Sequence, residues 1–430
     1  MKKISTFILT LLIVAITSIN SVASGLNNTS DIQNIIGQSA IVMDMDTGEI
    51  IASKNADVQR PMASTVKLLT SLIFAENTSN TQMIPFTSEA LKTTQTSLNN
   101  LKRINVGEEI SSNDLMKAVL KYSANDASYL MADSVAGNYI DFVKMMNDRA
   151  KSLGLKNTHI VNPCGLESNA VDPSDTEINL STAYDMAIIA KEAYKNQWIR
   201  ETVSDKSENL VINIGGQPVT IKSRNKIIGQ DGNIGGKTGN ESQAGHCFVG
   251  FFERDGRKLV TVVLNSIYGI DGTNVFKDTK QIADYGYGAK KEVFKKAGEE
   301  ICKVDLEYRI FGFIGPKKKI EVPVIASKDI MYYKNNINDK NAKIEYKEEK
   351  KSPWRLVNKE IELNLSLPNY ESKVLGKADL SLFDLIKISI LPFILMVIEI
   401  IIVLVVVACI LRFINIRKKR NERQRKRRRR

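Results

Sequence analysis

Three short motifs, in a fixed order along the chain, carry side chains that could perform acyl transfer through serine. The first pairs Ser64 with Lys67, the second pairs Ser123 with Asn125, and the third begins at Lys237. A serine hydroxyl is a poor nucleophile without a base, and residues three apart on a helix share a face, so Lys67 should lie beside Ser64. Each motif alone is weak, but the ordered set supplies a nucleophile, a base, a proton relay and a carboxylate anchor.

The first motif requires a neutral lysine if Lys67 is to deprotonate Ser64. The ordinary pKa of a lysine side chain is about 10.4, which is too high for a base near neutral pH. Burial and a second nearby cation would both lower this pKa, and Lys237 is a candidate for that cation. Taken alone, Ser64 and Lys67 would be interpreted as a serine at a helix start and a solvated lysine.

The second and third motifs supply the remaining groups. Ser123 can pass a proton to a leaving amine, and Asn125 can hold the lysine or a substrate amide, although both residue types also cap helices. Lys237 and Thr238 on an edge strand can bind a substrate carboxylate, and Gly239 lets a ligand approach the backbone closely. The alternative for this motif is a glycine-rich turn with a solvated lysine.

One more cation could serve the same carboxylate. Arg224 lies 13 residues before Lys237, within Ser223-Arg224-Asn225. A lone arginine in a loop is usually solvated, so this assignment depends on the family resemblance given below.

The elements that must position these residues follow from hydrophobic periodicity. Two apolar runs flank Asp46-Thr47-Gly48 and predict a hairpin over residues 39–54, and two more strands are predicted at 246–252 and 258–265. Helices are predicted between them, at 62–76, 113–135, 139–153 and 179–194. Strands at both ends with helices between predict one α+β domain over residues 25–290, with an antiparallel sheet that draws on both ends.

A second, β-rich domain is predicted over residues 291–375. Strand-like segments alternate there with charged turns, and no long helical period occurs. The predicted strands are 300–310, 319–324, 329–333, 342–346 and 360–367.

The two ends of the chain are predicted to lie outside these domains. Residues 1–24 have the basic start, apolar run and small-residue cleavage site of a signal peptide. A transmembrane helix is predicted over 385–411, because the 24 residues 388–411 include a single charged side chain, Glu399. The basic tail, 412–430, then fixes the cytoplasmic side, so we expect a single-pass protein of the cell membrane with its body outside and contact between the tail and anionic lipid.

The charge distribution argues against nucleic acid as a partner. The chain carries a net charge of +12, but residues 412–430 hold 12 Lys or Arg and one Glu, which leaves the rest at +1. The body therefore lacks a general basic footprint. Four scattered cysteines and two histidines, without metal-ligand spacing, predict neither a metal site nor a disulfide framework.

The motifs, in this order and at these separations, resemble those of low-molecular-mass penicillin-binding proteins, the serine-type D-alanyl-D-alanine carboxypeptidases. The resemblance covers about residues 30–370 and implies a penicillin-binding/β-lactamase-like transpeptidase domain followed by a β-rich domain. The segments that carry it are 61–67, 122–127, Asn162-Pro163-Cys164-Gly165-Leu166, 223–225, and 236–239 with Ala244-Gly245.

The resemblance also implies roles, and no cofactor. Ser64 would attack the carbonyl between the last two D-alanines of a peptidoglycan stem peptide, with Lys67 as base and Ser123 and Asn125 in the relay to the departing D-alanine. A β-lactam would acylate Ser64 in the same way. Lys237, Thr238 and Arg224 would hold the terminal carboxylate beside Gly239, and the N–H groups of Ser64 and Asn240 would form the oxyanion hole.

Two features depart from the family pattern and leave alternatives open. Glu241 stands where the family usually has threonine, and a carboxylate there should repel the substrate carboxylate unless it turns away. The C-terminal span also replaces the surface helix of many relatives. One alternative is a β-lactamase of the same fold, which needs a carboxylate that activates the deacylating water; the sequence assigns none and leaves Glu167 and Glu177 unplaced. The other is a β-lactam- or peptidoglycan-binding sensor that acylates without turnover, or a weakly active homologue.

Overall fold

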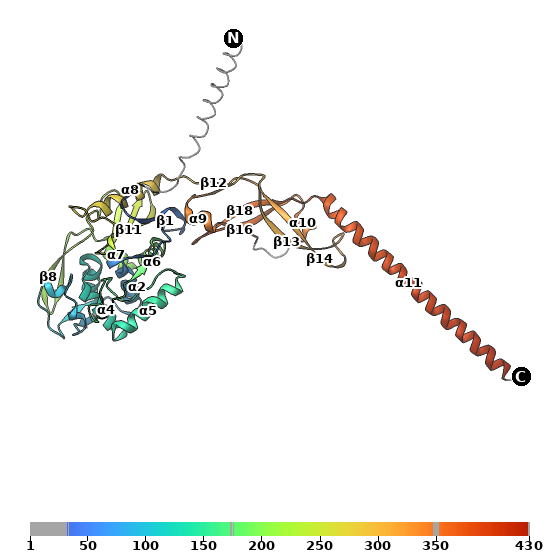
Figure 1. Cartoon of the computed structure of the whole chain (residues 1–430), viewed down its shortest axis with the longest axis horizontal. Coiled ribbons are helices and arrows are strands. Elements are labelled where there is room, and N and C mark those ends of the chain that lie inside the picture. The colour runs from blue at the N-terminus through green and yellow to red at the C-terminus, as the bar shows by residue number, and fades with distance from the viewer. Residues whose placement is uncertain (1–31, 33, 173, 175, 347–351, 429–430) are drawn as a thin grey trace, which may run out of the picture. The chain divides into compact units, whose positions relative to one another are not determined.

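The computed structural model describes residues 32, 34–172, 174, 176–346 and 352–428, so the predicted signal peptide lies outside the described residues. The chain forms two compact units (Figure 1). The first contains the chain up to Glu292 together with Tyr333–Ala342 and Leu367–Tyr370, and the second contains the remaining segments. The late segments belong with the first unit because the side-chain amides of Asn335 and Asn338 both donate to the backbone oxygen of Ile50.

The first unit is built on an antiparallel sheet with the order β2-β1-β11-β10-β9. Its strands are β1 (Ser39–Asp44), β2 (Ile50–Lys54), β9 (Asn233–Glu241), β10 (Gly245–Arg254) and β11 (Arg257–Ser266). The pairing of β1 with β11 joins the two ends of the domain, as the predicted α+β class requires. Strand β9, which carries Lys237-Thr238-Gly239, forms one edge of this sheet.

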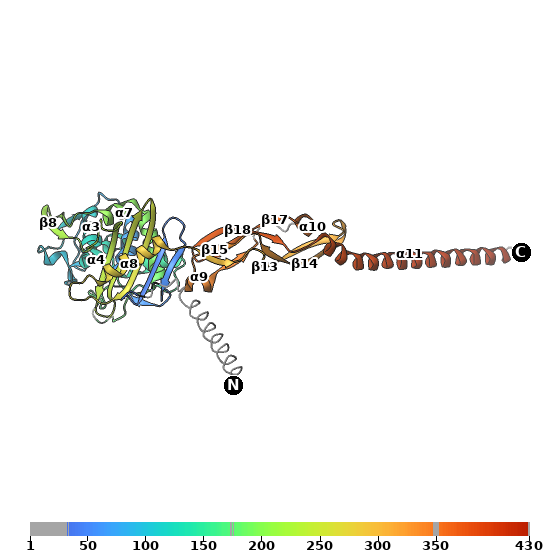
Figure 2. The ribbon, with the colours of Figure 1, turned by 90° about the horizontal axis from the view of Figure 1, so that it is seen from above.

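Both faces of the sheet are covered, because alternate side chains of each strand face opposite sides. From β1, Ile41 and Met43 enter the larger core shared with the helical layer, whereas Ala40 and Val42 enter a smaller core. The smaller core is closed by α8 (Asn274–Gly288), which lies across β10 and β11 (Figure 2).

The helical layer is the insertion between β2 and β9. It contains α2 (Lys67–Asn77), α3 (Ser112–Lys117), α4 (Asn125–Ala136), α5 (Tyr139–Ser152), α6 (Ala183–Lys195) and α7 (Gln197–Ser204). The predicted single helix over 113–135 was wrong, because a π-helical turn, η4 (Ala118–Tyr122), ends at Ser123, whose φ of +73° is left-handed. The break leaves Ser123 outside both helices and restarts the chain as α4 at Asn125.

Smaller sheets complete the first unit. A hairpin of β7 (Asn209–Ile214) and β8 (Gln217–Lys222), which we did not predict, joins β4 (Met83–Pro85) and β5 (Glu109–Ser111). The two-residue strands β3 (Arg60–Pro61) and β6 (Leu180–Ser181) pair just before Ser64, which fixes the entry to α2.

The second unit is β-rich, in agreement with the predicted fold. Its five-stranded sheet has the order β13-β14-β18-β17-β16, and β12 (Glu292–Lys295) pairs with β15 (Ile330–Tyr332). The sheet strands are β13 (Glu300–Ile310), β14 (Ile314–Ala326), β16 (Lys343–Glu345), β17 (Glu360–Leu367) and β18 (Tyr370–Ala378). Two short helices, α9 (Asn336–Asn341) in the first unit and α10 (Pro353–Leu356) in the second, were not predicted.

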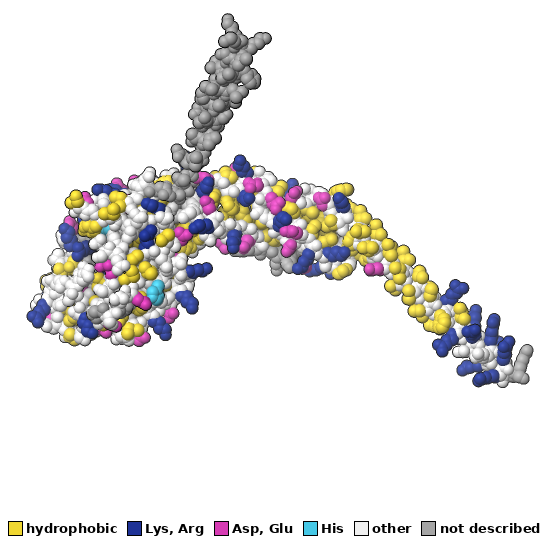
Figure 3. Space-filling view, viewed as in Figure 1, with side chains coloured by type: hydrophobic (Ala, Val, Ile, Leu, Met, Phe, Trp, Pro, Cys, Tyr) yellow, Lys and Arg dark blue, Asp and Glu magenta, His cyan; other side chains and the backbone are white. Residues whose placement is uncertain are grey.

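The chain continues into α11 (Leu382–Arg427), which has 46 residues and begins with a capping box between Ser381 and Asp384. By length and composition it could cross a membrane, and its most apolar window is not buried. An apolar stretch is followed by a cluster of Lys and Arg at its C-terminal end (Figure 3).

Candidate active site

Ser64 lies in the 3-10 turn η1 (Ala63–Val66) that leads into α2. Ala63 before it has a φ of +47°, a strained value that turns the serine toward the cleft. Two glycines make room for this turn. A Cβ at Gly239 of β9 would lie 3.0 Å from the Ser64 nitrogen, and one at Gly165 would lie 2.1 Å from the Ala63 oxygen. The nucleophile is thus held between an edge strand and a loop that both approach at backbone distance.

Lys67, one helical turn later, is fully buried and has three polar partners. Its Nζ lies 2.8 Å from Ser64 Oγ, 2.6 Å from Asn125 Oδ1 and 2.5 Å from the carbonyl oxygen of Cys164. A neutral amine has two N–H donors and one lone pair. Because the amide oxygen and the carbonyl can only accept, they would take both N–H groups of the neutral amine and leave its lone pair for the Ser64 hydroxyl, which also lies 3.3 Å from the Cys164 oxygen. This arrangement suits proton transfer from serine to lysine.

The environment of Lys67 also favours the neutral amine. Burial lowers the pKa of Lys67 to about 8, although the nearby Cys164, Glu241 and Asp126 raise it. Of the two causes considered from the sequence, burial and the charge of Lys237, burial accounts for the lowered pKa of Lys67. The repulsion between the two lysines acts on Lys237 instead, whose pKa lies well below its usual range because of burial and then of Lys67.

Asn125 is the first residue of α4, and its amide orientation is fixed. Its Nδ2 donates to the Gln95 oxygen over 2.7 Å, so Oδ1 faces Lys67. Its backbone N–H donates to the Thr96 oxygen over 2.9 Å. The loop that supplies these carbonyls is held by the neighbouring Asp126, which accepts from Ser97 Oγ at 2.6 Å and from two backbone N–H groups that follow.

Ser123 faces the buried lysine of the third motif. Lys237 Nζ lies 2.9 Å from Ser123 Oγ and 2.7 Å from the Thr238 oxygen. The left-handed backbone of Ser123 aims this hydroxyl into the cleft rather than along η4. Lys67 bonds Ser64 and Lys237 bonds Ser123, so two hydroxyls, each with its own lysine, face the same cleft.

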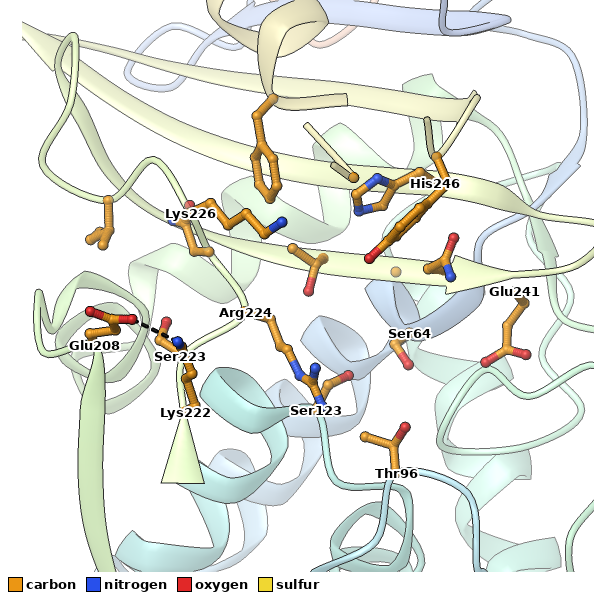
Figure 4. Close-up of a pocket in the computed structure, with 18 of the residues that line it drawn as sticks. Ser64, Thr96, Ser123, Glu208, Lys222, Ser223, Arg224, Lys226, Glu241 and His246 are labelled. Carbon is orange, nitrogen blue, oxygen red and sulfur yellow. Dashed lines mark ion pairs between the residues drawn. The ribbon is translucent and has the colours of Figure 1, made fainter. Parts of the chain in front are cut away.

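The cleft has a volume of about 710 Å³ and lies between β9 and the helical layer (Figure 4). Ser64, Thr238 and Arg224 line it, whereas Lys237 is 1% exposed and lies behind Ser123. Arg224 is held by its Nε bond of 3.3 Å to the Tyr122 oxygen and by its position 5.0 Å above that tyrosine ring. The guanidinium therefore faces the cleft as a fixed cation.

Glu241 lies at the other end of the cleft. Arg224 and Glu241 flank Ser64 on opposite sides in Figure 4. The carboxylate has therefore turned away from the group expected to bind the substrate carboxylate. Its Oε2 accepts from Gln95 Nε2 over 3.4 Å, and burial raises its pKa, with Glu167 acting in the same direction and Lys67 against it.

The two other carboxylates considered in the sequence do not line the cleft among the residues described. Glu167 Oε1 accepts from the backbone N–H groups of Gln243 and Ala244 and holds the turn between β9 and β10. Glu177 is exposed and lies 3.6 Å from the ring of His159. Neither lines the cleft beside Ser64, so neither supplies the carboxylate that the β-lactamase alternative needs.

Three contributors to the site were not assigned from the sequence: the Cys164 carbonyl, the Gln95-Thr96 loop and the half-buried Glu241 as a wall of the cleft. The segment around Cys164 was noted as part of the resemblance, but a backbone oxygen carries no residue-type signal. Asn240 also lines the cleft, and its place in the oxyanion hole stays a prediction.

Comparisons with known proteins agree with this geometry. The D-alanyl-D-alanine carboxypeptidase family, peptidase family S11, matches residues 26–267. The D-alanyl-D-alanine carboxypeptidase DacF of Bacillus subtilis is 30% identical over 232 residues, which are 53% of this chain and 57% of the relative, so the match spans just over half of that relative's length. The D-alanyl-D-alanine carboxypeptidase DacA of Haemophilus influenzae is 27% identical over 355 residues, 80% of each chain.

A solved structure supports the predicted fold. Penicillin-binding protein D2 from Listeria monocytogenes, in its ampicillin-bound form, matches with a TM-score of 0.52 and 27% identity, covering 59% of this chain and 99% of that chain. The penicillin-binding/β-lactamase-like class is therefore confirmed. The family match covers more than half of the residues of this chain. The chain therefore belongs to the D-alanyl-D-alanine carboxypeptidase family, the S11 serine peptidases.

Proposed function

We propose that this protein is a membrane-anchored serine carboxypeptidase that removes the terminal D-alanine from peptidoglycan stem peptides. The observation that carries the proposal is the contact between Lys67 Nζ and Ser64 Oγ, 2.8 Å long, in which the other two partners of the amine are obligate acceptors. That arrangement gives a serine nucleophile with its own base and no histidine.

In the proposed acylation, Ser64 Oγ attacks the carbonyl of the D-Ala-D-Ala bond while its proton passes to Lys67. The tetrahedral oxyanion is stabilised by the backbone N–H groups of Ser64 and Asn240, a contribution worth roughly 10²–10³ in rate for each donor. The carbon–nitrogen bond then breaks, and the proton that Lys67 took from Ser64 is relayed to the leaving amine through Ser123, which is hydrogen-bonded to Lys237, so that Lys67 becomes neutral again. Water releases the acyl group and regenerates Ser64.

Orientation of the substrate follows from the cations. Thr238 and Arg224 line the cleft and would bind the terminal carboxylate directly. Lys237 is buried and would act on that carboxylate mainly through its charge, since its Nζ bonds Ser123. A β-lactam also carries a carboxylate next to a reactive carbonyl, so it would enter in the same orientation and acylate Ser64.

The membrane anchor is part of this proposal. The apolar stretch of α11 is long enough to span the bilayer, and the basic residues after it would lie on the cytoplasmic side, in contact with anionic lipid. The catalytic unit would then face the cell wall, where its substrate is.

A sensor that acylates without turnover is the second candidate, and Glu241 is the observation that favours it. The departure from the family pattern occurs at a residue that lines the cleft. The two candidates differ in turnover, because a sensor would form the acyl-enzyme and release little D-alanine.

The test is D-alanine release from Nα,Nε-diacetyl-L-Lys-D-Ala-D-Ala by the full-length protein in detergent micelles, beside Ser64→Ala. We expect release by the wild type and none by the variant, and labelling by fluorescent penicillin should follow the same pattern. Labelling at Ser64 without release of D-alanine would contradict the carboxypeptidase and support the sensor. If the wild type showed no labelling and no release of D-alanine, both candidates would be contradicted.

A further inference from the structure

A second depression adjoins the catalytic cleft beyond Ser64. It has a volume of about 550 Å³ and shares Asn240, Glu241 and Tyr268 with the cleft. Its other walls are mostly polar and include the side chains of Gln38, Gln95, Ser242 and Asn265. Among the described residues that line it, Glu241 carries the only formal charge. The depression is therefore a polar site with one negative charge and no competing cation.

The depression lies where the acyl part of the substrate must go. Alternate residues of a strand share a face, and one face of β9 presents Lys237 to Ser123, Gly239 to the Ser64 nitrogen and Glu241 to Gln95. The substrate carboxylate binds on the side of Arg224, so the chain on the other side of the scissile carbonyl runs toward Glu241 (Figure 4).

The spacing identifies which substrate residue arrives there. From Thr238 to Glu241 the strand rises by about 10 Å, at roughly 3.3 Å per residue. An extended peptide advances about 7 Å over the two residues that separate the terminal D-alanine from the residue before D-Ala-D-Ala. The side chain of that residue covers the remaining distance, so Glu241 can be reached by its far end.

We propose that Glu241 and this depression form a subsite for a positively charged side chain on the residue before D-Ala-D-Ala. The substrate class would then be stem peptides whose diamino acid keeps a free side-chain ammonium. This inference rests on the proposed function and deepens it. It also gives the departure from the family pattern a role, since a threonine at this position would supply no charge.

The contacts of Glu241 leave capacity for such a ligand. The bond from Gln95 Nε2, at 3.4 Å, is long for a hydrogen bond. An ionised carboxylate offers about four acceptor sites, so an ammonium can bind without breaking an existing strong contact. An ion pair between Glu241 and an ammonium would add a modest but measurable amount to the binding free energy, because water partly screens ion pairs in a half-exposed setting.

The test compares two substrates that differ only at the ε-amino group, where an acetyl group removes the charge in one of them. The full-length protein is given Nα-acetyl-L-Lys-D-Ala-D-Ala, with a free ε-ammonium, and the Nα,Nε-diacetyl peptide, and kcat/KM is measured for each near neutral pH. We expect the wild type to prefer the free ammonium by about two- to fivefold, the range for a partly exposed charge pair. In Glu241→Gln the ratio should fall to about one, because the charge is lost while the size of the side chain and one acceptor oxygen are kept.

The matched control is Glu208→Gln. Glu208 also lines the cleft but lies on the side of Arg224, where it pairs with Lys222 at 2.9 Å. This variant should keep the wild-type ratio. A wild type without preference, or a preference that survives in Glu241→Gln, would overturn the subsite.

A separate readout keeps the subsite testable if no D-alanine is released. The two peptides then compete with fluorescent penicillin for Ser64, and the ratio of the concentrations that halve labelling replaces the ratio of kcat/KM. A roughly two- to fivefold advantage of the free ammonium that depends on Glu241 would support the subsite even though the carboxypeptidase had failed. Equal competition, or no labelling at all, would overturn it.

Discussion

The protonation of Lys67 predicts a steep dependence of acylation on pH. Only the neutral amine can accept the proton of Ser64, and the pKa of Lys67 is about 8. Below this value the lysine is protonated and inactive as a base, so acylation must become faster as pH rises. The neutral fraction grows from about 9% at pH 7 to about 91% at pH 9, which predicts a roughly tenfold increase in the acylation rate constant.

The assay is the second-order rate constant for labelling of the full-length protein by fluorescent penicillin, measured across this pH range. Ser64→Ala supplies the background at each pH, and the fraction of labelled protein at saturation shows that the enzyme remains intact. Because the Lys67 and Lys237 ammonium groups repel each other, the observed midpoint belongs to the pair.

Glu241→Gln tests how far Lys67 contributes to that midpoint. The carboxylate of Glu241 raises the pKa of Lys67, so its removal should move the whole curve to lower pH. Glu208→Gln, which changes a carboxylate that pairs with Lys222, should leave the curve in place. A rate constant that stays flat or falls over this range would refute Lys67 as the base, and a curve that Glu241→Gln does not move would refute the electrostatic link.

The remaining predictions concern packing and the anchor. In Gly165→Ala the new Cβ would lie 2.1 Å from the Ala63 oxygen, so we expect the acylation rate to fall by about 100-fold and the melting temperature to drop. The control, Gly154→Ala, has a similar positive φ but no atom near its Cβ, so it should show only the small backbone effect. Equal behaviour of the two variants would contradict the close packing at Ser64. A chain that ends after Ile390 keeps the buried Ser389 but loses the apolar part of α11, so it should leave the membrane fraction with its penicillin labelling intact, and retention in the membrane would contradict the proposed anchor.

Features that depend on local periodicity could be predicted from the sequence. The contact between Ser64 and Lys67 follows from their spacing on one helix face. The hairpin of β1 and β2 follows from two apolar runs around a turn. The alternation of Leu210, Ile212 and Ile214 before two glycines carried the same signal for the β7–β8 hairpin, and we overlooked it.

Features that depend on long-range packing could not be predicted. The apolar pattern of 113–135 continues through Ser123, so nothing local shows that this residue takes a left-handed backbone. That conformation is held by its surroundings, above all by the buried lysine 114 residues later that bonds its hydroxyl. Likewise, the Cys164 carbonyl meets Lys67 across 97 residues, and any residue type would offer the same oxygen.

The topology explains why the motifs keep their order and why they meet. The helical layer is inserted between β2 and β9, with Ser64 near its start and Lys237 in the strand that follows it. The site therefore forms only when the insertion closes and β9 returns to the sheet, with Gly239 against the Ser64 nitrogen. A shift between the sheet and the helical layer that is too small to expose the core would still change the distance between Lys67 and Lys237. Acylation rate should thus respond to interlayer packing more sensitively than the free energy of unfolding does.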